Sequence, residues 1–156
     1  MDYDVTYEVL EALEKEEVRY AIFGAVAVAI HGLPRATEDL DIFIAPEAEN
    51  VERLKRALRR VFADPAIDEI TSEDLLGDYP AVQYVPPEGA FHLDVLTRLG
   101  QAFRWEDLDV QRAPFQGMLV NVITPAFLYR MKRDTVRPKD RVDAEALRLR
   151  FRLGDS

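Results

Sequence analysis

The chain of 156 residues contains no cysteine, only two histidines and only two serines. The lack of cysteine excludes disulfides, thiol catalysis and thiolate metal sites, and it is compatible with the cytoplasmic location that we expect. Two histidines on separate segments do not make a zinc motif. The serines, Ser72 and Ser156, do not lie in a nucleophile-elbow context. The common cysteine, serine and zinc chemistries are therefore not predicted.

Long hydrophobic runs are also missing. No stretch of 18 apolar residues occurs, so we expect no membrane-spanning segment. The N-terminal segment MDYDVTYEVLEALEKEE is acidic and has a helical pattern, without the basic and apolar regions of a secretory signal. With 48% hydrophobic residues, the length fits a single domain over residues 1–156 with a substantial core.

The charge of the chain is unevenly distributed. The net charge of −9 argues against nucleic-acid binding by the whole surface. Residues 130–152, however, hold nine Lys or Arg and four Asp or Glu, a local balance of +5 that leaves −14 for the remainder. An acidic body with a basic C-terminal segment suits a polyanionic ligand held at one place. The alternative is a solvated helix with ion pairs along its surface.

Apolar periodicity and turn residues predict alternating helices and strands. Helices are predicted over residues 4–17, 25–31, 46–62, 124–133 and 138–153, with a helical turn over 72–76. Strands are predicted over residues 18–23, 40–45, 67–71, 81–85, 91–96, 110–115 and 118–123. The order indicates an α/β (α+β) domain with a C-terminal helical segment over 124–153.

The most informative stretch is FGAVAVAIHGLPRATEDLDIFI, residues 23–44. Alternation along a strand places Asp39 and Asp41 on one face, about 7 Å apart at their Cα atoms, while Leu40 and Ile42 face a core. Two carboxylates on one face repel each other unless a cation lies between them. The pair therefore predicts a divalent-metal site.

Two further features support this prediction. Gly24-Ala25 forms a small-residue turn before a helix start, where unpaired backbone N–H groups favour a phosphate. Asp94 is an acid inside the apolar run Phe91–Leu96, where an unpaired charge would cost several kcal/mol. A metal bridge joining Asp94 to Asp39 and Asp41 would explain its position. The alternatives are a nearby Arg partner or the solvated face of an edge strand.

An ordered set of short motifs resembles the DNA polymerase β-like nucleotidyltransferase superfamily. The set comprises Gly24-Ala25, His31-Gly32, Arg35-x-Thr37-x-Asp39-x-Asp41 and Asp94. It is most similar to small stand-alone members, including nucleotidyltransferase toxins of toxin–antitoxin systems. The stretch from Met131 to Asp143, with Lys132 and Lys139, resembles the lysine-bearing segment that closes many of these proteins. The resemblance implies a mixed β-sheet flanked by helices, and transfer of a nucleoside monophosphate from an NTP to an acceptor hydroxyl.

The resemblance also implies residue roles. Asp39 and Asp41 would bind two Mg²⁺ ions, with Mn²⁺ as an alternative, and Asp94 would bind one ion and help to deprotonate the acceptor.

The remaining implied residues would contact the nucleotide. Gly24 and Ala25 would hold the triphosphate. Arg35 and Thr37 would lie near the phosphates, and Lys132 and Lys139 would face them from the other side.

One departure from the family pattern is Gly-Ala where Gly-Gly or Gly-Ser is usual. It removes a hydroxyl donor to phosphate, which keeps open the alternative of a catalytically inactive nucleotide-sensing or partner-binding module. The acceptor implied by the family is the 3′ end of tRNA or another RNA, a protein or a small molecule. A partner protein or a homodimer is expected to complete the site, because the chain lacks a large second domain.

Other residues have weaker functional signals. We expect His31 to cap the last carbonyls of its helix. We expect His92 to face the opposite side of its strand from Asp94 and to take no part in the metal site. Phe103, Trp105 and Tyr129 favour core packing over base stacking.

Overall fold

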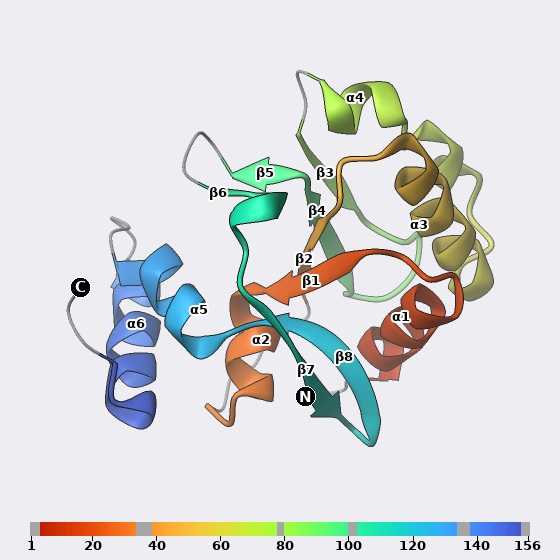
Figure 1. Cartoon of the computed structure of the whole chain (residues 1–156). Helices are drawn as coiled ribbons and strands as arrows, with labels where there is room; N and C mark the ends of the chain where they lie inside the picture. The colour runs from red at the N-terminus through yellow and green to blue at the C-terminus, as the bar shows by residue number, and fades with distance from the viewer. Residues whose placement is uncertain (1–3, 34–38, 78–79, 100–102, 134–137, 154–156) are drawn as a thin grey trace.

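The computed structural model describes residues 4–33, 39–77, 80–99, 103–133 and 138–153. Figure 1 shows a six-stranded mixed sheet with strand order β3-β4-β2-β1-β8-β7 and a separate two-stranded ribbon, β5-β6. The strands are β1 (Tyr20–Phe23), β2 (Asp39–Ile44), β3 (Ala81–Tyr84), β4 (His92–Leu96), β5 (Arg98–Leu99), β6 (Phe103–Arg104), β7 (Val110–Phe115) and β8 (Met118–Ile123). The helices are α1 (Asp4–Lys15), α2 (Gly24–Ile30), α3 (Ala48–Val61), α4 (Ser72–Leu76), α5 (Pro125–Arg133) and α6 (Pro138–Phe151), with the 3₁₀ turns η1 (Pro65–Glu69) and η2 (Trp105–Asp107).

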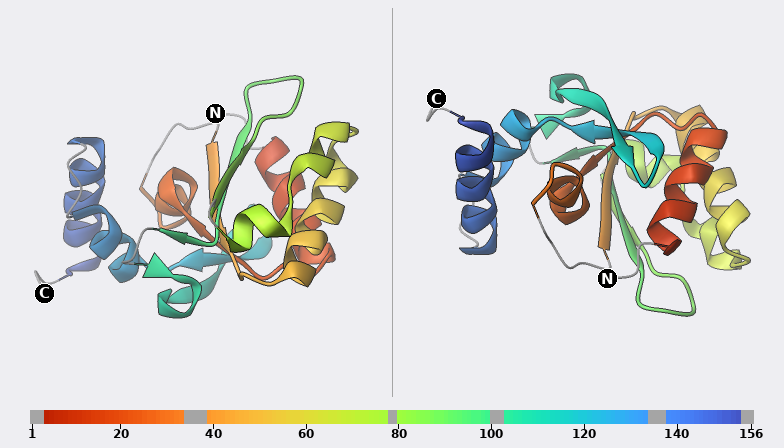
Figure 2. Two further views of the ribbon diagram at one scale, coloured as in Figure 1. Left: turned by 90° about the horizontal axis from the view of Figure 1, so that it is seen from above. Right: turned by 90° about the horizontal axis from the view of Figure 1, so that it is seen from below.

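The helices cover the sheet in two layers. Figure 2 shows α1 and α3 on one side of β2, and α2, α5 and α6 on the other. β2 is antiparallel to β1 and parallel to β4, so it is the central strand of the half that carries the acids. None of the described helices is long and apolar enough to cross a membrane.

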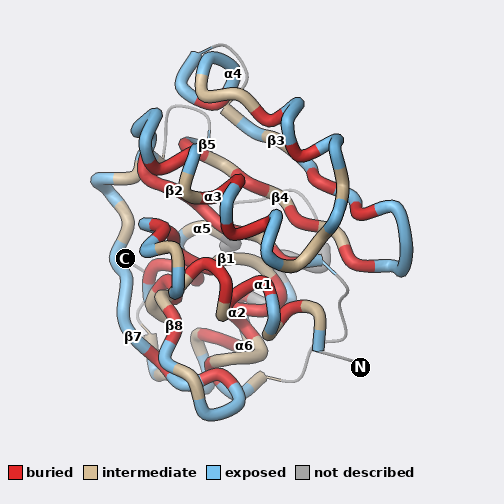
Figure 3. The backbone as a smooth tube through the Cα atoms, turned by 90° about the vertical axis from the view of Figure 1, so that its right-hand side faces the viewer, coloured by how far each residue is buried: buried red, intermediate tan, exposed pale blue. Residues whose placement is uncertain are grey.

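Burial is concentrated in the central strands. Ile22, Leu40, Ile42, Leu93 and Val95 are each 0% exposed. In Figure 3 the buried colour follows these strands, and the exposed colour marks the turns and outer helices. The side chains of β2 alternate between the two faces of the sheet, as the sequence predicts. Leu40 and Ile42 enter the core, and Asp39 and Asp41 lie on the other face. The sheet therefore presents its acids next to a rigid interior.

The predicted α/β architecture with C-terminal helices is confirmed. The hairpins β3-β4 and β7-β8 pair antiparallel as their turn sequences indicate. Thr124 is the expected N-cap of α5, since its Oγ1 accepts a hydrogen bond from the backbone N–H of Phe127 at 3.4 Å and donates to Asp109 Oδ2 at 3.0 Å. Local sequence signals were sufficient for these elements.

The strand predicted over residues 67–71 is wrong. Pro65–Glu69 forms the 3₁₀ turn η1, because Asp64 Oδ1 accepts a hydrogen bond from Ala66 N at 3.0 Å and Pro65 favours a helical start. Ile67 is buried as a single anchor rather than as part of an alternating strand. The ribbon β5-β6 and the turn η2 were not predicted, because two-residue strands have no measurable periodicity.

Candidate active site

The acids lie on neighbouring strands. Asp41 on β2 is the direct Cα partner of Asp94 on the parallel strand β4. On its other side Asp41 pairs with Phe23, the last residue of β1. Direct partners in a sheet point to the same face, so the two carboxylates project from one surface although 52 residues separate Asp41 from Asp94 in the chain. Asp41 therefore occupies the centre of the candidate site.

Asp39 lies one pleat away on the same face and pairs with His92. Its Oδ1 is 3.2 Å from His92 Nδ1, and the two residues are Cα partners across β2 and β4. The prediction that His92 faces away from Asp94 is therefore wrong. Residues two apart in a strand share a face, so His92 and Asp94 point to the same side. A correct period-two count would have placed His92 in the site.

Gly24 brings the turn between β1 and α2 against Asp41. Its φ is +71°, and a Cβ atom at this position would lie 2.1 Å from Asp41 Oδ2. The left-handed backbone and the close approach both require glycine here. The next residue, Ala25, is only 9% exposed, so its methyl group packs into the protein. The turn and the central carboxylate thus form one contiguous unit.

The other predicted phosphate contacts cannot be placed in the same way. Arg35 and Thr37 lie outside the described residues, in the segment between α2 and β2. Lys132 lies on α5 and Lys139 on α6, but their side chains are outside what the structure describes. Their roles remain predictions.

A divalent cation requires oxygen donors that converge. Among the residues that the structure describes, no group of three or more His, Asp or Glu side chains lies in metal-binding positions. The donor chemistry nevertheless fits, because carboxylate oxygens are the ligands that Mg²⁺ prefers and the register places three of them on one face. In the structure the Asp39 carboxylate also contacts His92.

His31 is the C-cap residue of α2, where its backbone N–H donates to the carbonyl of Ala27 at 3.1 Å, but its side chain bonds another element. It is 8% exposed, and its Nε2 donates a hydrogen bond to the carbonyl of Ile123 at 2.8 Å. Its ring also packs edge-on against Phe151, with the centroids 5.8 Å apart. The imidazole thus ties the end of α2 to β8 and α6 rather than capping its own helix.

This contact predicts a pH-dependent stability. The pKa of His31 is lowered, mainly because the ring is buried and also because the positive charge of Arg150 lies nearby. His31 binds a proton more readily in the unfolded chain than in the folded one. Neutral His31 therefore makes its full contribution to the free energy of unfolding above about pH 6.5, and this contribution is lost as the pH falls. We expect Tm to drop less between about pH 7 and 5.5 in His31→Gln than in the wild type. His92→Gln, which alters the half-buried histidine on β4, is the control, and an unchanged slope in His31→Gln would contradict the assignment.

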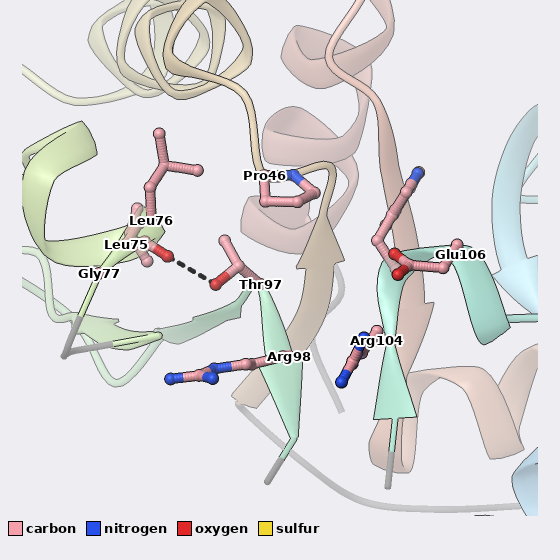
Figure 4. Close-up of a pocket in the computed structure, with 9 residues that line it drawn as sticks. Pro46, Leu75, Leu76, Gly77, Thr97, Arg98, Arg104 and Glu106 are labelled. Atoms are coloured by element: carbon pink, nitrogen blue, oxygen red, sulfur yellow. Dashed lines mark hydrogen bonds between the residues drawn. The ribbon is translucent and has the colours of Figure 1, made fainter. Parts of the chain in front are cut away.

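Two of the aromatic residues pack as expected. Phe103 meets Phe127 edge-on with the ring centroids 5.5 Å apart. Tyr129 is 8% exposed and belongs to the core. Trp105 is partly buried, like Phe103, but of the three it is the one that lines a described cavity, which Figure 4 shows.

The mixed sheet brings the glycine turn and the acids of β2 and β4 together in one candidate site. The model of the AbiEii nucleotidyl transferase toxin family, of type IV toxin–antitoxin systems, matches residues 9–132. The chain belongs to this family, and it is a nucleotidyltransferase. No curated protein matches it significantly.

Solved structures support the fold. The lincosamide adenylyltransferase LnuA, bound to lincomycin, has a TM-score of 0.61 at 13% identity, covering 95% of this chain and 97% of that one. ANT(2″)-Ia in complex with adenylyl-2″-tobramycin has a TM-score of 0.56 at 14% identity, covering 96% and 90%. An antigenic nucleotidyltransferase-like protein from Paracoccidioides brasiliensis has a TM-score of 0.53 at 20% identity, covering 92% and 74%.

Proposed function

We propose that this chain transfers a nucleoside monophosphate from an NTP to an acceptor hydroxyl in a Mg²⁺-dependent reaction. The observation that carries the proposal is the direct pairing of Asp41 with Asp94, with Asp41 against the Gly24 turn. Like charges directly opposite in a sheet are destabilising, so their placement against the close-packed Gly24 turn favours a functional role over a structural one. Family membership supplies the reaction class.

In this proposal the acceptor hydroxyl oxygen attacks the α-phosphorus, and pyrophosphate leaves as the bond to its bridging oxygen breaks. Asp39, Asp41 and Asp94 would hold the Mg²⁺. The bound ion would neutralise the charge that develops on the phosphoryl oxygens. Asp94 would also accept the proton of the acceptor hydroxyl.

The nucleotide would be held by the rest of the predicted set. Gly24 and Ala25 would offer backbone N–H groups to the triphosphate, and Arg35, Thr37, Lys132 and Lys139 would neutralise or brace it. We also propose that the enzyme is the toxin of a toxin–antitoxin pair, because the family whose model it matches consists of such toxins.

Labelled substrates test the proposal. The purified chain is incubated with each α-³²P-labelled NTP and Mg²⁺, together with total RNA or lysate protein. Label should appear in one acceptor class and depend on the divalent ion. In parallel, the matching NTP should raise Tm only in the presence of Mg²⁺. If no NTP labels an acceptor and none shifts Tm with Mg²⁺, the proposal fails.

A further inference from the structure

The short helix α2 connects the candidate active site to the C-terminal helix α6, and in both views of Figure 2 it lies between β2 and α6. Its first residue, Gly24, lies against Asp41, and its C-cap, His31, is on the order of 10 Å further along the axis. The side chains that α2 buries are all Ala or Val. Such small side chains make few contacts, so they resist a shift of the helix only weakly. The position of Gly24 therefore depends on what holds the other end of α2.

Arg150 on α6 holds that end. Its Nε donates a hydrogen bond to the carbonyl of His31 at 2.8 Å, although 119 positions separate the two residues. The last carbonyls of a helix have no partner within the helix, and a cation near them also interacts favourably with the helix dipole. A hydrogen bond from a charged donor is stronger than one between neutral groups. Arg150 thus supplies the contact that the end of α2 needs.

The residue after His31 shows how closely the guanidinium group approaches. Gly32 has φ of +93°, and a Cβ atom there would lie 2.6 Å from Arg150 Nη2 and 3.0 Å from its Cζ. The same Cζ is 5.4 Å from the centroid of the Phe151 ring, which packs edge-on against His31. The pair His31-Gly32, which the sequence marks as a motif, is therefore the seat for the end of α6.

The helix that carries Arg150 is itself fixed to the core, because Ala144 and Leu147 are buried. We propose that Arg150 is a positioning residue of the nucleotide site. It holds the end of α2 against α6, and α2 in turn holds Gly24 against Asp41. This inference rests on the proposed function, in which Gly24 and Asp41 bind the NTP and its Mg²⁺. It gives the C-terminal helix a part in nucleotide binding that needs no contact between Arg150 and the nucleotide.

Nucleotide binding without turnover tests the positioning role. The probe is the NTP that raises Tm in the presence of Mg²⁺. Its Kd for the whole chain is measured by isothermal titration calorimetry with Mg²⁺ and without acceptor, at a temperature at which circular dichroism shows each variant to be folded. Arg150→Ala should raise Kd about tenfold. A loss of stability alone would leave the Kd of the folded molecules unchanged, so an unchanged Kd would overturn the proposal.

Arg112→Ala is the matched control. Arg112 donates hydrogen bonds to the two carboxylate oxygens of Glu14 at 3.0 and 3.1 Å, so it joins β7 to α1 as Arg150 joins α6 to α2. The substitution removes the same charge and a comparable contact between two elements, and it should change Kd less than twofold. An equal loss in Arg112→Ala and Arg150→Ala would show a general effect of charge and overturn the proposal.

Gly32→Ala tests the same contact from the other side. The added Cβ would displace the guanidinium group of Arg150, so Gly32→Ala should weaken NTP binding about as much as Arg150→Ala. Because both substitutions break one contact, the double variant should bind no more than about twofold more weakly than either single variant. Losses that multiply, to about a hundredfold, would show independent effects and overturn the proposal.

Hydrogen exchange tests the contact in the absence of nucleotide. The backbone amides of α2 should exchange several times faster in Arg150→Ala than in the wild type, and Arg112→Ala should leave their exchange unchanged. Unchanged exchange in Arg150→Ala would overturn the proposal. A wild-type chain that binds the NTP with Mg²⁺ but transfers no NMP would refute the proposed reaction and leave the positioning role of Arg150 in place.

Discussion

Asp41→Asn is expected to reduce NMP transfer by about a thousandfold or more, the scale of losing a principal electrostatic stabiliser of the transition state. Asp41 is the acid with the most central position, because it pairs with Asp94 on one side and with the end of β1 on the other. The substitution keeps the size of the side chain but removes the charge that would hold Mg²⁺. Initial rates of labelled NMP transfer at saturating NTP measure the loss.

The same variant should lose far less stability than activity. The carboxylates of Asp41 and Asp94 project from directly opposite positions, and like charges so placed repel each other. Removing one charge relieves this repulsion, which offsets part of any stabilising contact that the carboxylate makes, so the change in Tm is expected to be small. This combination of lost activity with retained stability is typical of a residue kept for function rather than for folding.

Asp74→Asn is the control for this substitution. Asp74 is exposed on α4 and carries the same chemical change outside the candidate site. Its transfer rate should match that of the wild type within about twofold, as for a surface position. A wild-type rate in Asp41→Asn would place the reaction elsewhere in the molecule.

The fold was predictable where the signal is local. Each predicted hairpin is formed by strands adjacent in the chain and joined by Pro- or Gly-containing turns, and the helices have clear start and stop residues. The parallel pairing of β2 with β4 is different, because no local pattern specifies which strand lies beside which. Only the structure shows that Asp41 and Asp94 are directly opposite.

The candidate site was predictable in its acids but not in its neighbours. Asp39, Asp41 and Asp94 are conspicuous because charges inside apolar runs need an explanation. His92 shares their face, but it was assigned to the wrong side by an error in counting the strand period. The ribbon β5-β6 gave no signal, because a two-residue strand has no pattern and the ribbon arises only from the register of β5 with β6.

Gly24→Ala is expected to impair catalysis far more than stability. A Cβ atom at Gly24 would lie 2.1 Å from Asp41 Oδ2, which is closer than any real contact. The added Cβ would also lie 2.9 Å from Asp41 Cγ, so the whole carboxylate group of Asp41 must move and the central acid is displaced. We expect a loss of about a hundredfold or more in kcat/KM, because misplacement of a catalytic group by about 1 Å has effects of this size.

Gly89→Ala provides a matched control for the backbone component. Gly89 also has a left-handed backbone, with φ of +84°, but a Cβ atom there would meet nothing within 4 Å. Both variants incur the strain of an L-residue with positive φ, about 1–2 kcal/mol in the free energy of unfolding. Denaturant unfolding should therefore show similar losses, while only Gly24→Ala loses activity. Equal activities in the two variants would mean that the contact between the turn and Asp41 has no part in the reaction, and that the site does not depend on this geometry.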